Sequence, residues 1–327
     1  MCSINTFCSY MKNYPSNKIL LAVLLTLFHG AVDASDFSRY QILIATKNNH
    51  TAILIPSFHG NNILERRREF ETSLIAIIKK SNGNVCFEND PKEIADKFSI
   101  SDSSYRSTLF NEKFAAKKYF SENNDTVSRL IKKLNLSKEV ADRYLQLGTP
   151  IDLQLRVLTE VLLPFPRSQQ SSIDHIIASS ATMLGYKANY LESVDHVSIL
   201  MHSALEDKEL WQVALTKLST FSDCDACIKR YVDLLTKFEI SLFDGKMGES
   251  LKMYAKAVKI TGEDVLVLDA LVSKRNQYLA ERIGEYLNTD QCKVFAIGAA
   301  HFGGNNALQD ELASHGFDVK FEAIGGR

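Results

Sequence analysis

The run from Lys293 to Gly304, KVFAIGAAHFGG, constrains the possible folds of this chain more than any other segment. Residues 293–297 have strand character and lead into a turn of small residues that carries His301. Apolar, β-prone residues bounded by glycine are typical of a short buried strand. A histidine at the carboxyl end of such a strand lies where open α/β sheets bind their ligands. We therefore expect an α/β protein in which His301 belongs to a ligand site.

A second histidine, His59, has a similar setting far upstream, after the strand-like segment that begins at Ala52. One of these histidines lies near the start of the chain and the other near its end, and both follow strands, so they predict one shared site.

The N-terminus carries the pattern of a secretory leader. Two lysines, Lys12 and Lys18, precede an apolar run over 19–28, and small residues follow as far as Ala34. This order predicts a signal peptide over residues 1–34 and an exported protein, periplasmic or secreted, over 35–327. The alternative is an uncleaved leader that anchors the chain in a membrane. Both Met1 and Met11 stay open as the start of the chain.

The formal net charge of −1 gives no reason to expect a nucleic-acid partner, which requires a basic face. Four cysteines follow the leader. In an oxidising compartment, Cys224 and Cys227 of the Cys-Asp-Ala-Cys motif are expected to form a disulfide. A zinc site would need a second such motif, and a redox-active pair would follow a strand. Cys86 and Cys292 lie in strand-like segments and are expected to be small buried hydrophobes.

The order of apolar patterns predicts an α/β fold with a central mixed, mainly parallel sheet built from both chain ends. Large helical insertions, at about 91–182 and 205–287, separate the strands. Strand-helix-strand units favour parallel pairing with a right-handed crossover. The expected strands are Tyr40–Ala45, Thr51–Ile55, Val85–Glu88, Lys187–Leu191, Val294–Ile297 and Val319–Phe321, and the expected flanking helices are Asn62–Lys80, Leu271–Leu287 and Ala307–His315.

Four polar residues end predicted strands, namely His59, Glu88, Glu192 and His301. Imidazole nitrogens and carboxylate oxygens together suit a first-row divalent cation, and one glutamate can serve as ligand while the other acts as general base. The alternative is that each is a hydrogen-bonded structural residue or is solvated. His196, in helical sequence, is expected to be structural. Two further residues, Arg275 and Asn276, follow the pattern of a surface helix.

Several segments resemble the TraB/GumN family, which includes the animal Tiki proteins and is related to the erythromycin esterase and ChaN-like group. These segments are Leu271–Asn276, Ala280–Ile283, Ile297–Gly303 and Gly316–Val319. The family's first Gly-x-x-His motif falls on Pro56–His59, where Pro56 replaces the glycine. The family's glutamate after the second strand is Glu88. Its Leu-Glu-Thr motif corresponds to Leu191-Glu192-Ser193.

The resemblance implies one α/β domain with pseudo-repeated halves and a site between them. It implies that His59 and His301 are metal ligands and that Glu88 and Glu192 are ligands or a general base. Arg275 would stabilise a developing oxyanion and Asn276 would hold a ligand or a substrate amide.

Tiki proteins act as metal-dependent proteases. By resemblance, we expect an exported metal-dependent hydrolase that uses Mn, Co or Zn to cleave a peptide or another acyl bond in a peptide or small-molecule substrate. The alternative is a non-catalytic protein that captures haem or a peptide, as ChaN-like relatives imply, in which Pro56 marks a lost catalytic geometry.

Overall fold

A computed structural model describes residues 39–58, 67–90, 119, 122–133, 137–138, 141–142, 173–193, 195–197, 208–261, 272–304 and 306–324. The proposed leader at 1–34 and His59 lie outside these residues, so both stay predictions. All the described residues belong to one compact unit, Phe37–Arg327. None of the helices described is both long and apolar enough to cross a membrane.

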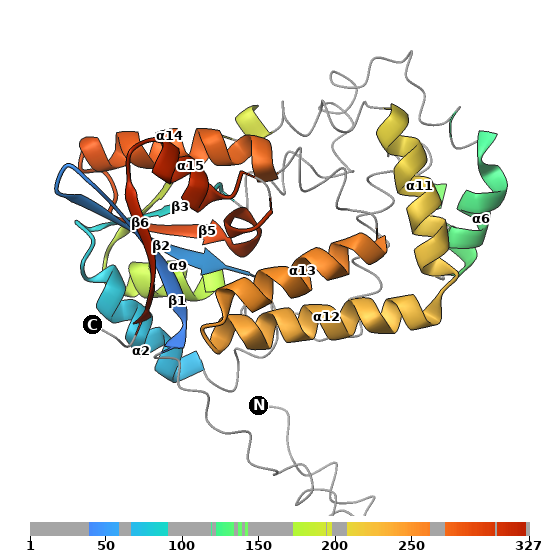
Figure 1. Cartoon of the computed structure of the whole chain (residues 1–327), viewed down its shortest axis with the longest axis horizontal. Coiled ribbons are helices and arrows are strands. Elements are labelled where there is room, and N and C mark those ends of the chain that lie inside the picture. Colours follow the sequence, from blue (N-terminus) through green and yellow to red (C-terminus); the bar gives the residue numbers. More distant parts are fainter. Residues whose placement is uncertain are drawn as a thin grey trace, which may run out of the picture. The chain divides into compact units, whose positions relative to one another are not determined.

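The described residues form a six-stranded mixed sheet with the order β4-β3-β5-β2-β1-β6 (Figure 1). From β4 to β2 the neighbouring strands are parallel, and β1 pairs antiparallel with both β2 and β6. The α/β class and the mixed sheet are thus confirmed. The strands are β1 (Gln41–Lys47), β2 (His50–Ser57), β3 (Asn84–Phe87), β4 (Lys187–Tyr190), β5 (Val294–Gly298) and β6 (Asp318–Ala323).

A tight hairpin joins β1 to β2. Its two loop residues, Asn48 and Asn49, have φ angles of 49° and 66°. Asparagine tolerates this left-handed region because its short side chain can hydrogen-bond locally, and two such residues twist a hairpin loop to match its strands. The pair Lys47–His50 closes the ladder.

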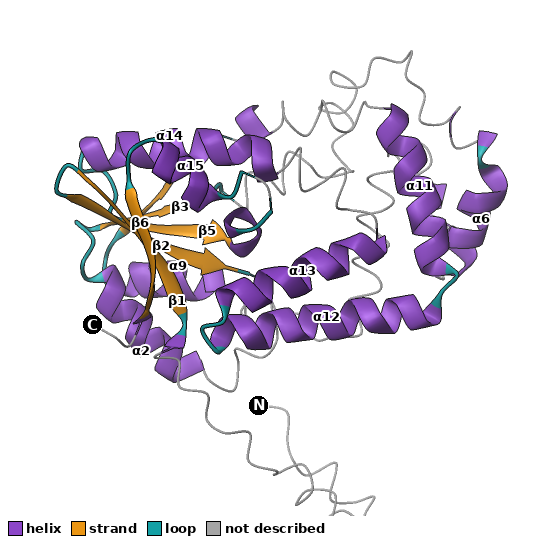
Figure 2. Ribbon diagram, in the orientation of Figure 1, coloured by secondary structure: helices purple, strands orange, loops and turns teal. Residues whose placement is uncertain are grey.

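Helices cover both faces of the sheet (Figure 2). On one face, α2 (Arg67–Ile78) and α9 (Ile173–Met183) pack on a core that includes Ile42 and Ile44. On the other face, α14 (Lys274–Asn288) and α15 (Leu308–Ser314) pack on a core that includes Leu43 and Ala45. Successive residues of β1 thus enter opposite cores, as the twofold period of a strand requires.

The remaining helices are α6 (Asn124–Lys133), α11 (Lys208–Ser222), α12 (Asp225–Phe243) and α13 (Met247–Thr261). The turn between α12 and α13 contains Gly245, with φ of 72°. A Cβ atom at this position would lie 2.0 Å from the carbonyl oxygen of Arg39, so no other residue fits the turn. Leu251 of α13 packs against Gly303, just after the 3-10 helix η6 (Ala299–Phe302) that carries His301.

The first strand-helix-strand unit, in which α2 joins β2 to β3, has parallel strands, but these two strands do not pair with each other. Strands β2 and β3 flank β5, which is parallel to each of them. Strand β6 pairs with β1 rather than with β5. Strand β5 occupies an inner position in the sheet, where its Val294, Phe295, Ala296 and Ile297 are all buried. A strand buried on both faces is stabilised most at such an inner position.

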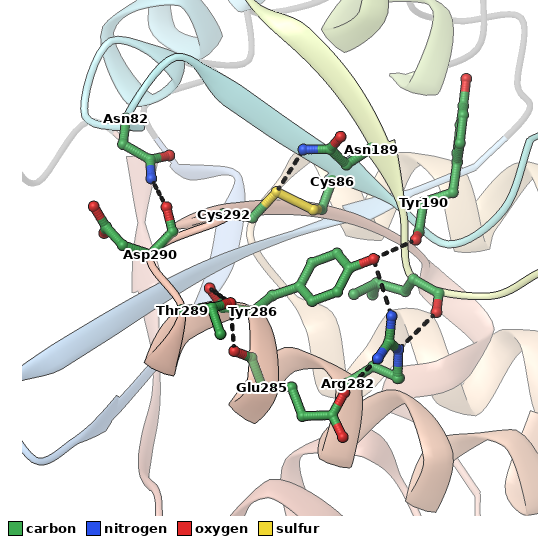
Figure 3. Close-up of a disulfide and its surroundings, with 11 residues drawn as sticks. Asn82, Cys86, Asn189, Tyr190, Arg282, Glu285, Tyr286, Thr289, Asp290 and Cys292 are labelled. Carbon is green, nitrogen blue, oxygen red and sulfur yellow. Dashed lines mark hydrogen bonds and ion pairs between the residues drawn. A yellow bond between two sulfur atoms is a disulfide. The ribbon is translucent and has the colours of Figure 1, made fainter.

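The expectation that Cys86 and Cys292 are unpaired is also wrong, because the two form a disulfide (Figure 3). Both are fully buried, as expected. Their Cα atoms are 6.1 Å apart because Cys86 lies in β3 and Cys292 just precedes the neighbouring β5. Asn189 of β4 donates from Nδ2 to Sγ of Cys292 over 3.8 Å. The expected Cys224–Cys227 disulfide is present.

Candidate functional site

The carboxyl ends of three adjacent parallel strands place the candidate residues together. Glu88 follows β3, Glu192 comes two residues after β4, and His301 lies in η6 after β5. The backbone N–H of Glu192 donates to the carbonyl of Glu88 over 3.0 Å, which extends the β3–β4 pairing to the site. Because these strands are neighbours, their ends meet at one edge of the sheet.

Helix α14 carries the other two candidate residues, Arg275 and Asn276. Hydrogen bonds from the middle of this helix hold it against the end of β4 (Figure 3). Arg282 donates from Nε to the carbonyl of Leu191 over 3.2 Å. Its Nη2 donates to the hydroxyl of Tyr286 over 3.0 Å, and that hydroxyl donates to the carbonyl of Tyr190, also over 3.0 Å. These bonds set the position of α14 relative to the strand end.

Arg275 is buried in this site, so the surface-helix interpretation of Arg275 and Asn276 is wrong. Its Nε donates to both carboxylate oxygens of Glu192, over 3.0 and 3.1 Å. Its Nη2 donates to Glu192 and to Glu88. The side chain of Glu192 is fully buried. Burial disfavours the charged guanidinium, but both carboxylates outweigh it and raise the pKa of Arg275 above its ordinary value.

The two carboxylate oxygens of Glu88 have different partners. Oε1 accepts from Nη2 of Arg275, while Oε2 accepts from the backbone N–H of Gly298 over 3.1 Å and lies 3.4 Å from Nε2 of His301. Burial tends to raise the pKa of the Glu88 carboxyl, but the charges of His301 and Arg275 and the Gly298 N–H lower it well below its usual range. Glu88 is therefore ionised at neutral pH.

Asn276 determines which nitrogen of His301 carries a proton. The amide nitrogen of Asn276 donates to the carbonyls of His301 and Asn306, over 3.2 and 2.7 Å. Its Oδ1 is therefore the acceptor in the 2.5 Å contact with Nδ1 of His301, which must be the donor. In the neutral imidazole, the lone pair then lies on Nε2, facing Oε2 of Glu88.

Two donor atoms of the kinds that bind divalent cations lie side by side here, Nε2 of His301 and Oε2 of Glu88. The two atoms are 3.4 Å apart, and a proton, a water molecule or a cation between them would relieve the repulsion of their lone pairs. The separation suits two adjacent ligands at about 2.1 Å from one ion. In metal sites, the imidazole nitrogen that does not bind the ion usually donates to a neighbouring acceptor, and this bond fixes the orientation of the ring. Among the described residues, however, no group of three or more histidine, cysteine, aspartate or glutamate side chains converges on one point.

The roles expected for Glu192 and His59 stay predictions. Both oxygens of Glu192 accept from Arg275, so the carboxylate holds the guanidinium in place. His59 lies outside the described residues.

Two further residues, His196 and Gly298, lie beside the side chains of this site. His196, expected to be only structural, stacks on Tyr278 of α14 with ring centroids 3.9 Å apart, and its Nε2 lies 3.9 Å from Oε1 of Glu192. Its spacing of four residues after Glu192 is the signal that marks it. At Gly298, a Cβ atom would lie 3.2 Å from Oε2 of Glu88, so the glycine of this motif leaves room for the carboxylate.

Pro56 fits the strand in which it lies. The amide of Ile53 donates to the carbonyl of Lys293, so by alternation the amides of Ile55 and Ser57 also face β5. The amide that Pro56 lacks would face away from β5, beyond the last β1–β2 pair, Leu43–Leu54. The hydroxyl of Tyr40 donates to the carbonyl of Pro56. The substitution of glycine therefore leaves the β2–β5 pairing intact.

A family model matches most of the chain, whereas single known proteins match only a short segment of it. One segment of 64 residues, 19% of this chain, is 38% identical to the Metalloprotease TIKI2 of Xenopus tropicalis, and a segment of 53 residues, 16% of this chain, is 40% identical to a Metalloprotease TIKI homolog of Nematostella vectensis. These segments span only 12% and 11% of the two relatives. No solved structure matches.

The family model has a much longer match. The TraB/PrgY/gumN family model matches residues 44–320, which include all of β2 to β5, part of β1 and β6, and the site residues Glu88, Glu192, Arg275, Asn276 and His301. The chain therefore belongs to the TraB/PrgY/gumN family.

Proposed function

We propose that this protein is an exported, metal-dependent hydrolase that cleaves a peptide or another acyl bond. The observation that carries the proposal is the contact between Nε2 of the buried His301 and Oε2 of the partly buried Glu88, 3.4 Å apart, with the opposite imidazole nitrogen bound to Asn276. The names of the two TIKI relatives support metal-dependent proteolysis.

His301 and Glu88 would hold the cation, and His59 is expected to complete the ligand set. A bound divalent cation polarises a substrate carbonyl and lowers the pKa of water. We assign Glu192 to the positioning of Arg275 in this scheme, because Nε and Nη2 of the guanidinium both donate to its carboxylate.

Arg275 would stabilise negative charge that develops on the substrate. Its charge is permanent, and its position is determined by two carboxylates on separate strands. A fixed cation needs no rearrangement as an oxyanion forms. If the histidines alone hold the metal, Glu88 is instead the candidate general base, since it is ionised at neutral pH.

Export is supported by both disulfides, one of them buried in the core. Structural disulfides persist in oxidising compartments. The predicted leader over 1–34 agrees with this placement.

The test is metal analysis of the purified chain together with a peptidase and esterase screen in the presence of Mn, Co or Zn. We expect His59→Ala and His301→Ala to lose bound metal and hydrolysis together. His315→Ala is the matched control, because this partly exposed histidine contacts Glu311 and Glu281 of helices α15 and α14, not the site residues. Unchanged metal content in both site variants would exclude the metal site.

A pH titration of metal affinity gives a second test. Neutral imidazole binds the metal, so affinity should fall as the pH drops below about 6.5, where histidine is protonated. Affinity that stays flat between about pH 5 and 8 would argue against ligation by histidine.

The second candidate function is non-catalytic capture of haem or a peptide, favoured by the proline that replaces glycine before His59. In that case the Glu88→Gln variant should bind haem or the peptide as tightly as the wild type does, and no divalent cation should support hydrolysis. An absorption spectrum that does not change on haem titration would exclude the haem version.

A further inference from the structure

The Cys224–Cys227 disulfide lies at the turn from α11 to α12 (Figure 1), and the proposed hydrolase does not use it. Both cysteines are partly exposed, whereas Cys86 and Cys292 are fully buried. Exchange of a disulfide requires that a thiolate reach one of its sulfur atoms. Of the two disulfides, only the Cys224–Cys227 pair meets this condition among the described residues.

Loop length separates the two disulfides further. Cys224 and Cys227 are three residues apart in sequence, whereas Cys86 and Cys292 are 206 apart. A cross-link that closes a short loop removes few conformations from the unfolded chain. The long-range disulfide therefore supplies most of the cross-link stabilisation, and stability alone gives little reason for the short one.

The surroundings of the two sulfurs in the pair differ. Cys224 is the N-cap of α12, a helix of 19 residues, and its Sγ accepts the backbone N–H of Cys227 over 3.1 Å. The positive end of a helix and this N–H stabilise a negative charge on that sulfur. Cys227 packs against the hydrophobic cluster that contains Phe221 and Tyr231. The helix end and the N–H of Cys227 therefore favour Cys224 as the sulfur that exchanges, while Cys227 packs in part against the protein.

We propose that Cys224 and Cys227 form a redox-active disulfide that exchanges with the dithiol of a partner protein. One thiolate of the dithiol attacks Sγ of Cys224, the Cys224–Cys227 bond breaks, and the electron pair goes to Sγ of Cys227. The second thiolate of the dithiol then attacks the first sulfur of the dithiol, which is bonded to Cys224 in the mixed disulfide, and releases the Cys224 thiolate. The dithiol is oxidised to a disulfide, the pair is reduced by two electrons, and the two protons of the dithiol end on Cys224 and Cys227.

A redox titration of the full-length, oxidised chain tests accessibility without any substitution. The chain is equilibrated in glutathione buffers with increasing ratios of reduced to oxidised glutathione, then alkylated, and each cysteine is quantified by mass spectrometry. We expect Cys224 and Cys227 to become half reduced at a ratio at least tenfold lower than Cys86 and Cys292, which serve as the control in the same sample. A pair that stays oxidised until the buried disulfide is reduced overturns the proposal.

Single substitutions test the difference between the two sulfurs. In Cys227→Ser, Cys224 should form a mixed disulfide with glutathione at least tenfold faster than Cys227 does in Cys224→Ser. Equal rates overturn the assignment of Cys224 as the reacting sulfur.

Transfer to a dithiol is tested with the wild-type chain, so the result does not depend on whether a variant folds. A reduced model peptide with a Cys-x-x-Cys motif should be oxidised as the Cys224–Cys227 disulfide is lost, mole for mole. A peptide that stays reduced overturns the exchange reaction. These outcomes do not involve metal content or hydrolysis, so they are independent of the function proposed above.

Discussion

At the scale of single residues, each buried polar group of the site has few possible hydrogen-bond partners, and this determines which atoms can bind a ligand. Asn276 has two N–H donors, and both go to backbone carbonyls. Its oxygen must therefore accept from His301, which leaves the other imidazole nitrogen to face Glu88. One amide thus determines which atom of His301 is available to a ligand.

Gly298→Ala should disturb the site far more than the fold. The new Cβ atom would lie 3.2 Å from Oε2 of Glu88 and 3.5 Å from a ring carbon of His301, so the carboxylate must move. We expect hydrolysis to fall at least tenfold, with a change in unfolding free energy of about 1 kcal/mol. Activity and denaturant unfolding measured on the same preparation check this.

The matched control for this variant is Gly284→Ala in α14, where the Cβ atom would meet only the ring of Phe317 at 3.8 Å. A glycine in a helix interior is about 0.5–1 kcal/mol less stable than alanine, so this variant should be more stable and fully active. Full activity in Gly298→Ala would contradict the close packing described at the site.

At the scale of secondary-structure elements, ion pairs and a disulfide hold the strand ends and α14 in one arrangement. Arg275→Met would leave the fully buried Glu192 without its cation. Removing one partner of a buried ion pair costs about 3–5 kcal/mol, because the other charge stays buried and unpaired. Denaturant unfolding of Arg275→Met should show a loss of this size.

The double variant Arg275→Met with Glu192→Leu separates pairing from packing. It should recover a large part of the lost stability, since Glu192 no longer leaves a buried unpaired charge and Glu88 keeps its contacts with Gly298 and His301. If the stability lost in the double variant equals the sum of the losses in Arg275→Met and Glu192→Leu, then Arg275 and Glu192 do not act as a pair.

Removal of the buried disulfide should destabilise the sheet more than removal of the exposed one. Cys86 and Cys292 join β3 to the start of β5 across 206 residues, for which chain entropy predicts about 5 kcal/mol. The same relation predicts about 2 kcal/mol for the three-residue separation of Cys224 and Cys227. Urea unfolding of Cys292→Ala and Cys227→Ala compares them, and equal losses would refute the loop-length argument.

At the scale of the whole molecule, the buried site links stability to pH. The pKa of Glu88 lies below its ordinary value in the folded protein, so the folded state binds a proton less readily than the unfolded state does. The stabilisation from Glu88 is therefore complete above the unfolded pKa of about 4.3 and is lost as the pH falls towards the folded pKa.

Unfolding of the metal-free chain and of Glu88→Gln between pH 7 and pH 3 tests this linkage. The wild type should be more stable at pH 7, and the difference between the two should shrink below about pH 4.5. A difference that stays constant over this range would show that Glu88 has the same pKa in both states. The comparison with the variant removes the contribution of other carboxylates.

Local patterns predicted most of the elements correctly. The expected strand at 319–321 lies within β6, and the helix expected over 307–315 is α15 with its ends one residue shorter. Gly316, after the end of α15, has a φ of 82°, which glycine adopts without strain. These features depend on residues close in sequence, so a single sequence contains the information.

Partners distant in sequence were the main source of error. Burial of Cys86 and Cys292 was evident from their apolar neighbours, but their disulfide depends on the place of β5 beside β3. Arg275 has the pattern of a surface residue on its own helix, because its acidic partners follow strands that lie more than 80 and more than 180 residues away. No local window contains these pairs.

The sequence by itself determined the class of fold, the elements, and the residues that end the strands, because apolar period, turn residues and chain order act locally. Only the tertiary structure decided that β5 separates β2 from β3, that one guanidinium joins Glu88 and Glu192, and that Asn276 orients His301. These contacts join residues far apart along the chain, and their free energy depends on burial that exists only after the sheet has formed.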